Sequence, residues 1–165
     1  MPLPPNDKKL FRNELAVYCK LAEQYESRWH YTQRRPYSGL GAAPQTYHYN
    51  DCSSYVALAF YWAMKHTQVR VGDPLGWKFS GWGNTETAIA YLDAHKAPSD
   101  KYRIGDVAIY GTPGDLSTQH MTVCRKAGTK ETSVWSSFGQ EAGPEKRPLV
   151  TGKRIIGVYR HPALL

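Results

Sequence analysis

The stretch NDCSSYVALAFYWAMKH, residues 50–66, carries the pattern of a helix with a polar start. Asn50 or Asp51 can cap this helix, because both side chains accept hydrogen bonds from the unpaired N–H groups of a first turn. Four apolar residues follow Cys52 on one face at helical spacing: Val56, Ala59, Phe60 and Ala63. The pattern therefore predicts a helix with Cys52 in its first turn.

This position suits a nucleophilic thiol. Only the thiolate attacks, and a helix N-terminus stabilises an anion through free N–H groups and the positive end of the macrodipole. With a histidine partner, such positions lower the pKa of a cysteine from about 8.5 to roughly 3.5–7.5. The alternative is an inert thiol packed as a small hydrophobe. Burying Cys52 in that way would cost free energy, because its neighbours in the sequence are polar. We expect Cys52 to be ionised at neutral pH.

Among six histidines, His120 is the predicted partner. It begins an expected strand, QHMTVC, after a loop that contains Gly and Pro. Alternation along a strand sends Met121 and Val123 to one face and His120, Thr122 and Cys124 to the other. We expect Cys124 to be a buried, inert thiol. Surface or capping roles are expected for the other five histidines: His30, His48, His66, His95 and His161.

Helices are expected on both sides of residues 50–66. One begins at Asn6 or Asp7, with apolar residues at Phe11, Leu15, Tyr18, Ala22 and Tyr25. Another is capped by Asn84, with Ile89 and Leu92 pointing inward. Residues 29–50 contain several Gly and Pro residues and are expected to form an aromatic loop.

In the second half of the chain, the sequence pattern changes from that of helices to that of strands. Four short segments rich in β-branched and aromatic residues predict strands: DVAIYG (106–111), HMTVCR (120–125), TSVWSSF (132–138) and RIIGVYRH (154–161). Helices followed by a mostly antiparallel sheet argue for an α+β fold.

Length and composition limit the class of protein. A chain of 165 residues and 18.7 kDa fits one domain, which we expect over residues 6–165 after a loose start at 1–5. A 41% hydrophobic and 13% aromatic composition excludes a disordered chain. No run approaches the roughly 18 apolar residues of a membrane span, and Met1–Asn13 has no secretory signal pattern.

The net charge and the cysteine content limit the binding partners and cofactors that we expect. A net charge of +7 predicts attraction to polyanions. The positive residues are scattered, so an anionic cell-wall polymer is favoured over nucleic acid. Three cysteines match neither a zinc site nor a disulfide framework, and no phosphate-binding glycine loop follows a strand. We expect no metal and no cofactor.

Several motifs together resemble the NlpC/P60 peptidases, papain-like cysteine enzymes that cut peptidoglycan stem peptides. The resemblance lies in NDCSSYVALAFYWA, then RIGDVAIYG with its Gly-Asp turn, then the strand that His120 opens. The stretches HYTQRRPYSGL, GWGNTET and VWSSFGQEAGP are similar to peptidase domains of endolysins from phages of actinobacteria. The resemblance covers about residues 29–157 and implies a papain-like fold, with helices packed on the sheet.

The resemblance also implies roles for individual residues. Cys52 would attack an amide carbonyl, and His120 would carry the proton to the leaving amine. The family's residue that orients the histidine is commonly His, Asn or Gln on the following strand. This chain has Ser136 and Ser137 there, with Glu141 beyond them. We favour Ser137, because it would share a face with Trp135 across the hairpin from His120.

Four further residues are candidates for binding substrate. Asp51 and Ser53 match family positions that bind the amino end of the stem peptide or hold the site together, although Asp51 could serve only as the helix cap. Tyr37 and Trp82, with Trp77, could line the substrate groove, because peptide and sugar recognition both use rigid aromatic walls. Core packing is the alternative for each ring.

The expected function is therefore that of a peptidoglycan endopeptidase, the catalytic domain of a phage endolysin and a monomer. It would be made in the host cytoplasm without a signal peptide and would act on the cell wall after release. Two alternatives stay open. One is an N-acetylmuramoyl-L-alanine amidase or acyltransferase of the same fold, and the other is a catalytically inactive cell-wall-binding module.

Overall fold

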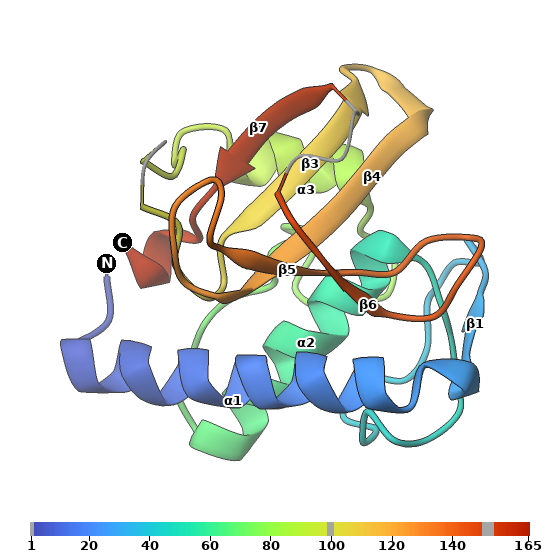
Figure 1. The fold of residues 1–165 in the computed structure, drawn as a ribbon, viewed down its shortest axis with the longest axis horizontal. Coiled ribbons are helices and arrows are strands. Elements are labelled where there is room, and N and C mark those ends of the chain that lie inside the picture. Colours follow the sequence, from blue (N-terminus) through green and yellow to red (C-terminus); the bar gives the residue numbers. More distant parts are fainter. Residues whose placement is uncertain (1, 99–100, 150–153) are drawn as a thin grey trace.

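Two long helices pack against one face of a five-stranded antiparallel sheet (Figure 1). This computed structural model describes residues 2–98, 101–149 and 154–165. The helices are α1 (Pro5–Gln24), α2 (Cys52–Thr67) and α3 (Thr85–Leu92), with single 3₁₀ turns at Glu26–Arg28 and Pro162–Leu164. The sheet has the order β6-β5-β4-β3-β7 and consists of β3 (Val107–Thr112), β4 (Asp115–Lys126), β5 (Val134–Ser137), β6 (Glu145–Arg147) and β7 (Ile155–Tyr159). The expected α+β class is confirmed.

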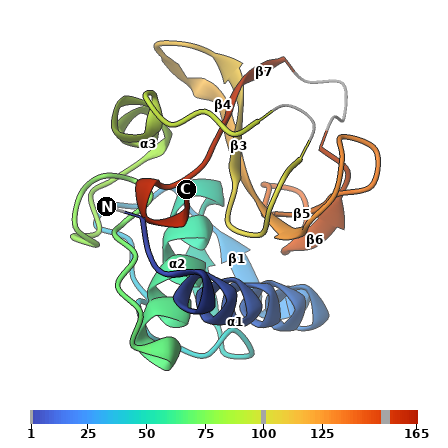
Figure 2. The same ribbon diagram turned by 90° about the vertical axis from the view of Figure 1, so that its left-hand side faces the viewer.

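Helix α2 is the centre of the molecule. Its first half is buried on every side, from Cys52 to Phe60, because α1 covers one flank and the sheet covers another. Phe11 of α1 meets Phe60 of α2 edge to face, with ring centroids 5.4 Å apart. In Figure 2, α1 and α2 lie side by side below the sheet, whereas α3 lies apart from this pair beside β4.

The start of α2 follows the sequence pattern. Asp51 is the N-cap, and its side chain accepts the Ser54 N–H at 2.9 Å while the Ser54 hydroxyl accepts the Asp51 N–H at 2.9 Å. This reciprocal capping box satisfies two backbone donors at once. Asn50, the other expected cap, instead donates its side-chain amide to the carbonyl of Ser38 at 3.0 Å. Asn84 caps α3 with Thr87 in the same reciprocal manner, as expected.

Helix α1 begins earlier than expected. It starts at Pro5, because proline fits the first helical position, where its missing N–H has no partner to lose. The predicted face is buried at Phe11, Leu15, Tyr18 and Ala22. The segment before the helix is not loose throughout, because the N–H of Leu3 donates to the carbonyl of Ala163 at 2.9 Å.

The two faces of the sheet carry separate apolar clusters. Met121 and Val123 face the helices within the main core, together with Val107 and Ile109. Cys124 lies in a smaller cluster on the other face, with Ala108, Tyr110 and Trp135. The alternation predicted for the strand of His120 is therefore confirmed.

Three features of the strands were not predicted. The expected loop at residues 29–50 contains β1 (Trp29–Tyr31), which pairs in parallel with β2 (His48–Asn50). The Trp29 ring stacks on His48, with centroids 3.9 Å apart. Strand β6 is also additional, and strands of three residues are too short to show a period. Strand β4 starts at Asp115, so His120 lies within the strand, opposite Tyr110. None of the described helices is long and apolar enough to cross a membrane.

Candidate functional site

The thiol of Cys52 lies beside β4, next to the residue that follows His120. Strand β5 ends at Ser137, which is in register with Thr122, so β5 does not cover the edge of β4 at Met121. The N-terminus of α2 approaches this edge, and the Cys52 sulfur is hydrogen-bonded there by the Met121 backbone N–H. The fold thus brings the cysteine of one segment and the strand of His120 together.

Cys52 is only 4% exposed, and this burial decides its acid–base state. Loss of solvent raises the pKa of the thiol to about 11, and the negative charge of Asp51 acts in the same direction. Hydrogen bonds from the Met121 and Ser53 backbones and from Tyr31 favour the thiolate but do not reverse the shift. A pKa of about 11 contradicts the expectation of an ionised sulfur at neutral pH, because burial opposes the charged form more strongly than these hydrogen bonds favour it.

His120 is held by the residue that the sequence favoured. Its Nε2 atom lies 2.7 Å from the hydroxyl oxygen of Ser137, across the β4–β5 pair. The Ser136 hydroxyl lies on the other face and is 2.7 Å from the Tyr55 hydroxyl on α2. Glu141 is exposed. Of the three residues considered for this role, Ser137 is the one that the structure places against the His120 ring.

Tyr31 lies at the thiol and was missed by the sequence analysis. Its side chain is hydrogen-bonded to both Cys52 and Gln33, and burial raises the pKa of its hydroxyl to about 12. Tyr31 reaches the site because β1 pairs with β2 in register, which places Tyr31 opposite Asn50, two residues before Cys52. The only signal in the sequence is the aromatic run at 29–31.

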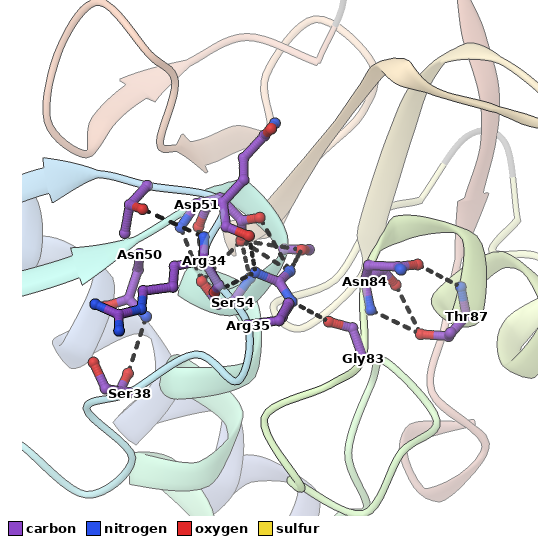
Figure 3. Close-up of polar contacts among 12 residues, drawn as sticks. Arg34, Arg35, Ser38, Asn50, Asp51, Ser54, Gly83, Asn84 and Thr87 are labelled. Carbon is purple, nitrogen blue, oxygen red and sulfur yellow. Dashed lines mark hydrogen bonds and ion pairs between the residues drawn. The ribbon is translucent and has the colours of Figure 1, made fainter.

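Arg35 is the second residue that the sequence analysis missed (Figure 3). One of its terminal nitrogens lies 3.0 Å from Asp51 Oδ2 in an ion pair and 3.0 Å from the Ser53 hydroxyl. The Ser53 hydroxyl also donates to Asp51 Oδ1 at 3.1 Å. Asp51 and Ser53 therefore hold the start of α2 together with Arg35, which is the structural alternative considered for them. Whether they also bind substrate stays a prediction.

Arg35 also ties this end of α2 to the loop before α3. Its Nε atom donates to the carbonyl of Gly83 at 3.0 Å, and Asn84 follows as the cap of α3 (Figure 3). The N–H of Tyr37 donates to the carbonyl of Gly81 at 2.8 Å. Trp82 lies between Gly81 and Gly83, whose carbonyls accept these two hydrogen bonds. It is 55% exposed, so its ring is available to a ligand.

The two other aromatic candidates differ from each other. Tyr37 is buried, with the Arg35 guanidinium 5.5 Å from its ring centroid, and so it packs in the core rather than lining an open groove. Trp77 is 52% exposed. Core packing, the alternative considered for each ring, describes Tyr37 but neither tryptophan.

Two of the other histidines, and both other cysteines, are buried. His48 stacks on Trp29 in the interior, so the surface or capping role expected for it is wrong, and burial lowers its pKa. Burial likewise lowers the pKa of His161 to about 4. Cys19 and Cys124 are fully buried, and burial raises the pKa of both thiols. Cys124 is therefore the buried thiol that the sequence predicts.

The described residues provide no group of three or more His, Cys, Asp or Glu side chains that could hold a metal ion. Comparison of the chain with models of protein families, with curated proteins and with solved structures found no match.

Proposed function

We propose that this protein is a cysteine peptidase that cuts amide bonds in peptidoglycan stem peptides, as in the NlpC/P60 domains that its sequence resembles. One observation carries the proposal. The Cys52 sulfur, at the start of a helix, accepts the N–H of the residue after His120, while the His120 ring is fixed by Ser137 at 2.7 Å. A thiol, an imidazole and an orienting hydroxyl on three separate segments are the parts that acyl transfer by a Cys–His pair requires.

The raised thiol pKa determines how the pair would act. A group with a pKa of about 11 is protonated at neutral pH, so His120 must take the proton while the sulfur attacks. Because Nε2 is held by Ser137, we assign the proton transfer to Nδ1, and Nε2–H then donates to the Ser137 hydroxyl. The same nitrogen returns the proton to the leaving amine. A neutral hydroxyl orients the ring but stabilises the imidazolium less than a carboxylate would.

Two donors are available for the negative oxygen of the tetrahedral intermediate. The backbone N–H of Cys52 lies in the first turn of α2 and has no partner within the helix. The Tyr31 hydroxyl is hydrogen-bonded to the same sulfur, and its raised pKa keeps it a donor across the physiological range. Two such donors are a common arrangement for stabilising the oxyanion of acyl transfer.

The substrate assignment rests on the resemblance and on charge. A net charge of +7 would hold the enzyme near the anionic polymers of a cell wall. The exposed Trp82, anchored next to Arg35, is the aromatic surface assigned to the peptide. The amidase or acyltransferase alternative would use the same residues on a different bond.

A second candidate function is a cell-wall-binding module without catalysis. The observation that favours it is the burial of Cys52, because a thiol that is 4% exposed and protonated is also what an inert packing residue would be.

Replacement of Cys52 separates these candidates. The experiment digests purified peptidoglycan with the parent, with Cys52→Ala and with Cys19→Ala, and identifies each new amine by mass spectrometry. Cys19 is the matched control, because it is a buried thiol on another helix, α1, where it lies beside Tyr55 and Ser136. We expect new amines with the parent and with Cys19→Ala and none with Cys52→Ala. Equal release by Cys52→Ala would refute the peptidase, and binding without release by the parent would support the module.

A further inference from the structure

A cavity of about 770 Å³ lies at the opposite end of α2 from Cys52. It is lined by the last turn of α2, by the loop between α2 and α3, and by Tyr91 of α3. Lys65, at the cavity, follows Cys52 by 13 residues along α2, which is about 20 Å at 1.5 Å per residue. The cavity is therefore separate from the candidate peptidase site, and its volume falls within the usual range of sites for small ligands.

The loop that forms one wall is folded around a buried carboxylate. Asp73 is 5% exposed and accepts backbone N–H bonds from Leu75 at 2.9 Å, from Trp77 at 3.2 Å and from Phe79 at 2.8 Å. Three donors on one carboxylate fix the course of the backbone from residue 73 to residue 79. The wall is thus formed before any ligand arrives.

This fixed loop holds two consecutive residues in the left-handed region. Lys78 has φ 52° and Phe79 has φ 55°, and both line the cavity. Such a conformation is strained for a residue other than glycine and persists where the surroundings enforce it, often at ligand sites. It places the Lys78 and Phe79 side chains on the wall, with the Phe79 ring packed edge-on against Tyr61 at 5.2 Å.

The charges that line the cavity do not cancel. Lys65, Arg70 and Lys78 are exposed, and none of them is in an ion pair with another residue of 2–98, 101–149 or 154–165. Asp73 is the one carboxylate in the lining, so two positive charges remain. A phosphate monoester carries about −1.5 to −2 at neutral pH and would balance them.

From these observations we propose that the cavity binds a sugar phosphate. The phosphate lies among Lys65, Arg70 and Lys78, and the sugar packs against the rings of Phe79 and Tyr91. Aromatic rings beside cations suit a ligand that joins a ring with apolar C–H faces to an anion, whereas either part alone would use only half of the lining. This site does not depend on the proposed peptidase.

The test is calorimetric titration of the whole protein with three probes: glucose 1-phosphate, glucose and inorganic phosphate. We expect glucose 1-phosphate to bind at least about tenfold more tightly than either part, because each charged contact contributes on the order of a factor of ten. Phosphate binding as tightly as the sugar phosphate would overturn the role of the sugar. Glucose binding as tightly would overturn the role of the cations.

Two lysine variants locate the binding. Lys78→Asn removes one charge, and asparagine tolerates the left-handed conformation, so the loop should keep its fold and the protein its melting temperature. Its affinity for glucose 1-phosphate should fall about tenfold. Lys130→Asn, at an exposed lysine outside the cavity, should bind as the parent does. Equal losses in the two variants, or none in Lys78→Asn, would refute the site. Cys52→Ala should bind glucose 1-phosphate as tightly as the parent does, so the outcome of this experiment does not depend on the proposed peptidase activity.

Discussion

The two ends of helix α2 are built in opposite ways. At its start, Asp51, Ser53 and Arg35 satisfy one another around a thiol that is 4% exposed. At its end, Lys65 joins two other cations at an open cavity with no ion pair among the described residues. The first end has its polar groups paired and its thiol protonated, whereas the second carries cations without an ion pair among the described residues. We therefore propose catalysis at the start of the helix and anion binding at its end.

The largest effect should follow from removing the base at the first end. His120→Ala leaves the neutral thiol of Cys52 without a proton acceptor, so the peptidoglycan-cleaving rate should fall about 10³-fold. The unfolding midpoint in urea should change little, because the ring is only half-buried. If the variant kept more than a tenth of the parent's cleavage rate, cleavage would not depend on His120.

Loss of Arg35 should affect both stability and the thiol. Arg35→Met leaves the Asp51 carboxylate without its ion pair beside Cys52, so the free energy of unfolding should fall by about 2 kcal/mol and the thiol pKa should rise further. Urea unfolding and alkylation rates measure the two effects.

Arg147→Met is the matched control, because its pair with Glu145 is exposed. This variant should change stability by no more than about 0.5 kcal/mol. If Arg35→Met lowers the free energy of unfolding no more than Arg147→Met does, the ion pair of Arg35 with Asp51 stabilises the protein no more than an exposed surface pair.

Substitution of each of the two adjacent serines of β5 should distinguish an effect on catalysis from an effect on packing. Ser137→Ala removes the group that orients His120 and should lower kcat about tenfold with little change in KM. Ser136→Ala breaks the contact with Tyr55 instead and should cost about 1 kcal/mol of stability while activity stays near that of the parent. A reversed pattern would remove Ser137 from the mechanism.

The smallest effect on cleavage should come from the other end of the helix. Lys78→Asn should leave the cleavage rate for a short soluble stem peptide within about twofold of the parent, because Lys78 lies at the far end of α2. A larger loss would mean that the two ends are coupled, and the division between them would fail.

The sequence predicted those parts of the site that depend on local pattern. The polar start of α2 identified Asp51 as a cap, and alternation along β4 and β5 identified the pair of His120 with Ser137. Arg35 and Tyr31 could not be predicted, because both come from a segment that Gly and Pro interrupt and that reaches the site through a parallel pair of three-residue strands. The neutral state of Cys52 was also missed, because burial by distant segments decides its pKa and no local pattern contains that burial.

The most direct test of a neutral thiol activated by His120 is the rate at which iodoacetamide alkylates Cys52 between pH 6 and pH 10, with the site identified by mass spectrometry. Since the thiol pKa is about 11, the rate should rise about tenfold per pH unit across this range without a plateau. A rate that levels off below pH 7 would show that the sulfur is already ionised there, and this would contradict proton transfer from a neutral thiol to His120 during the attack.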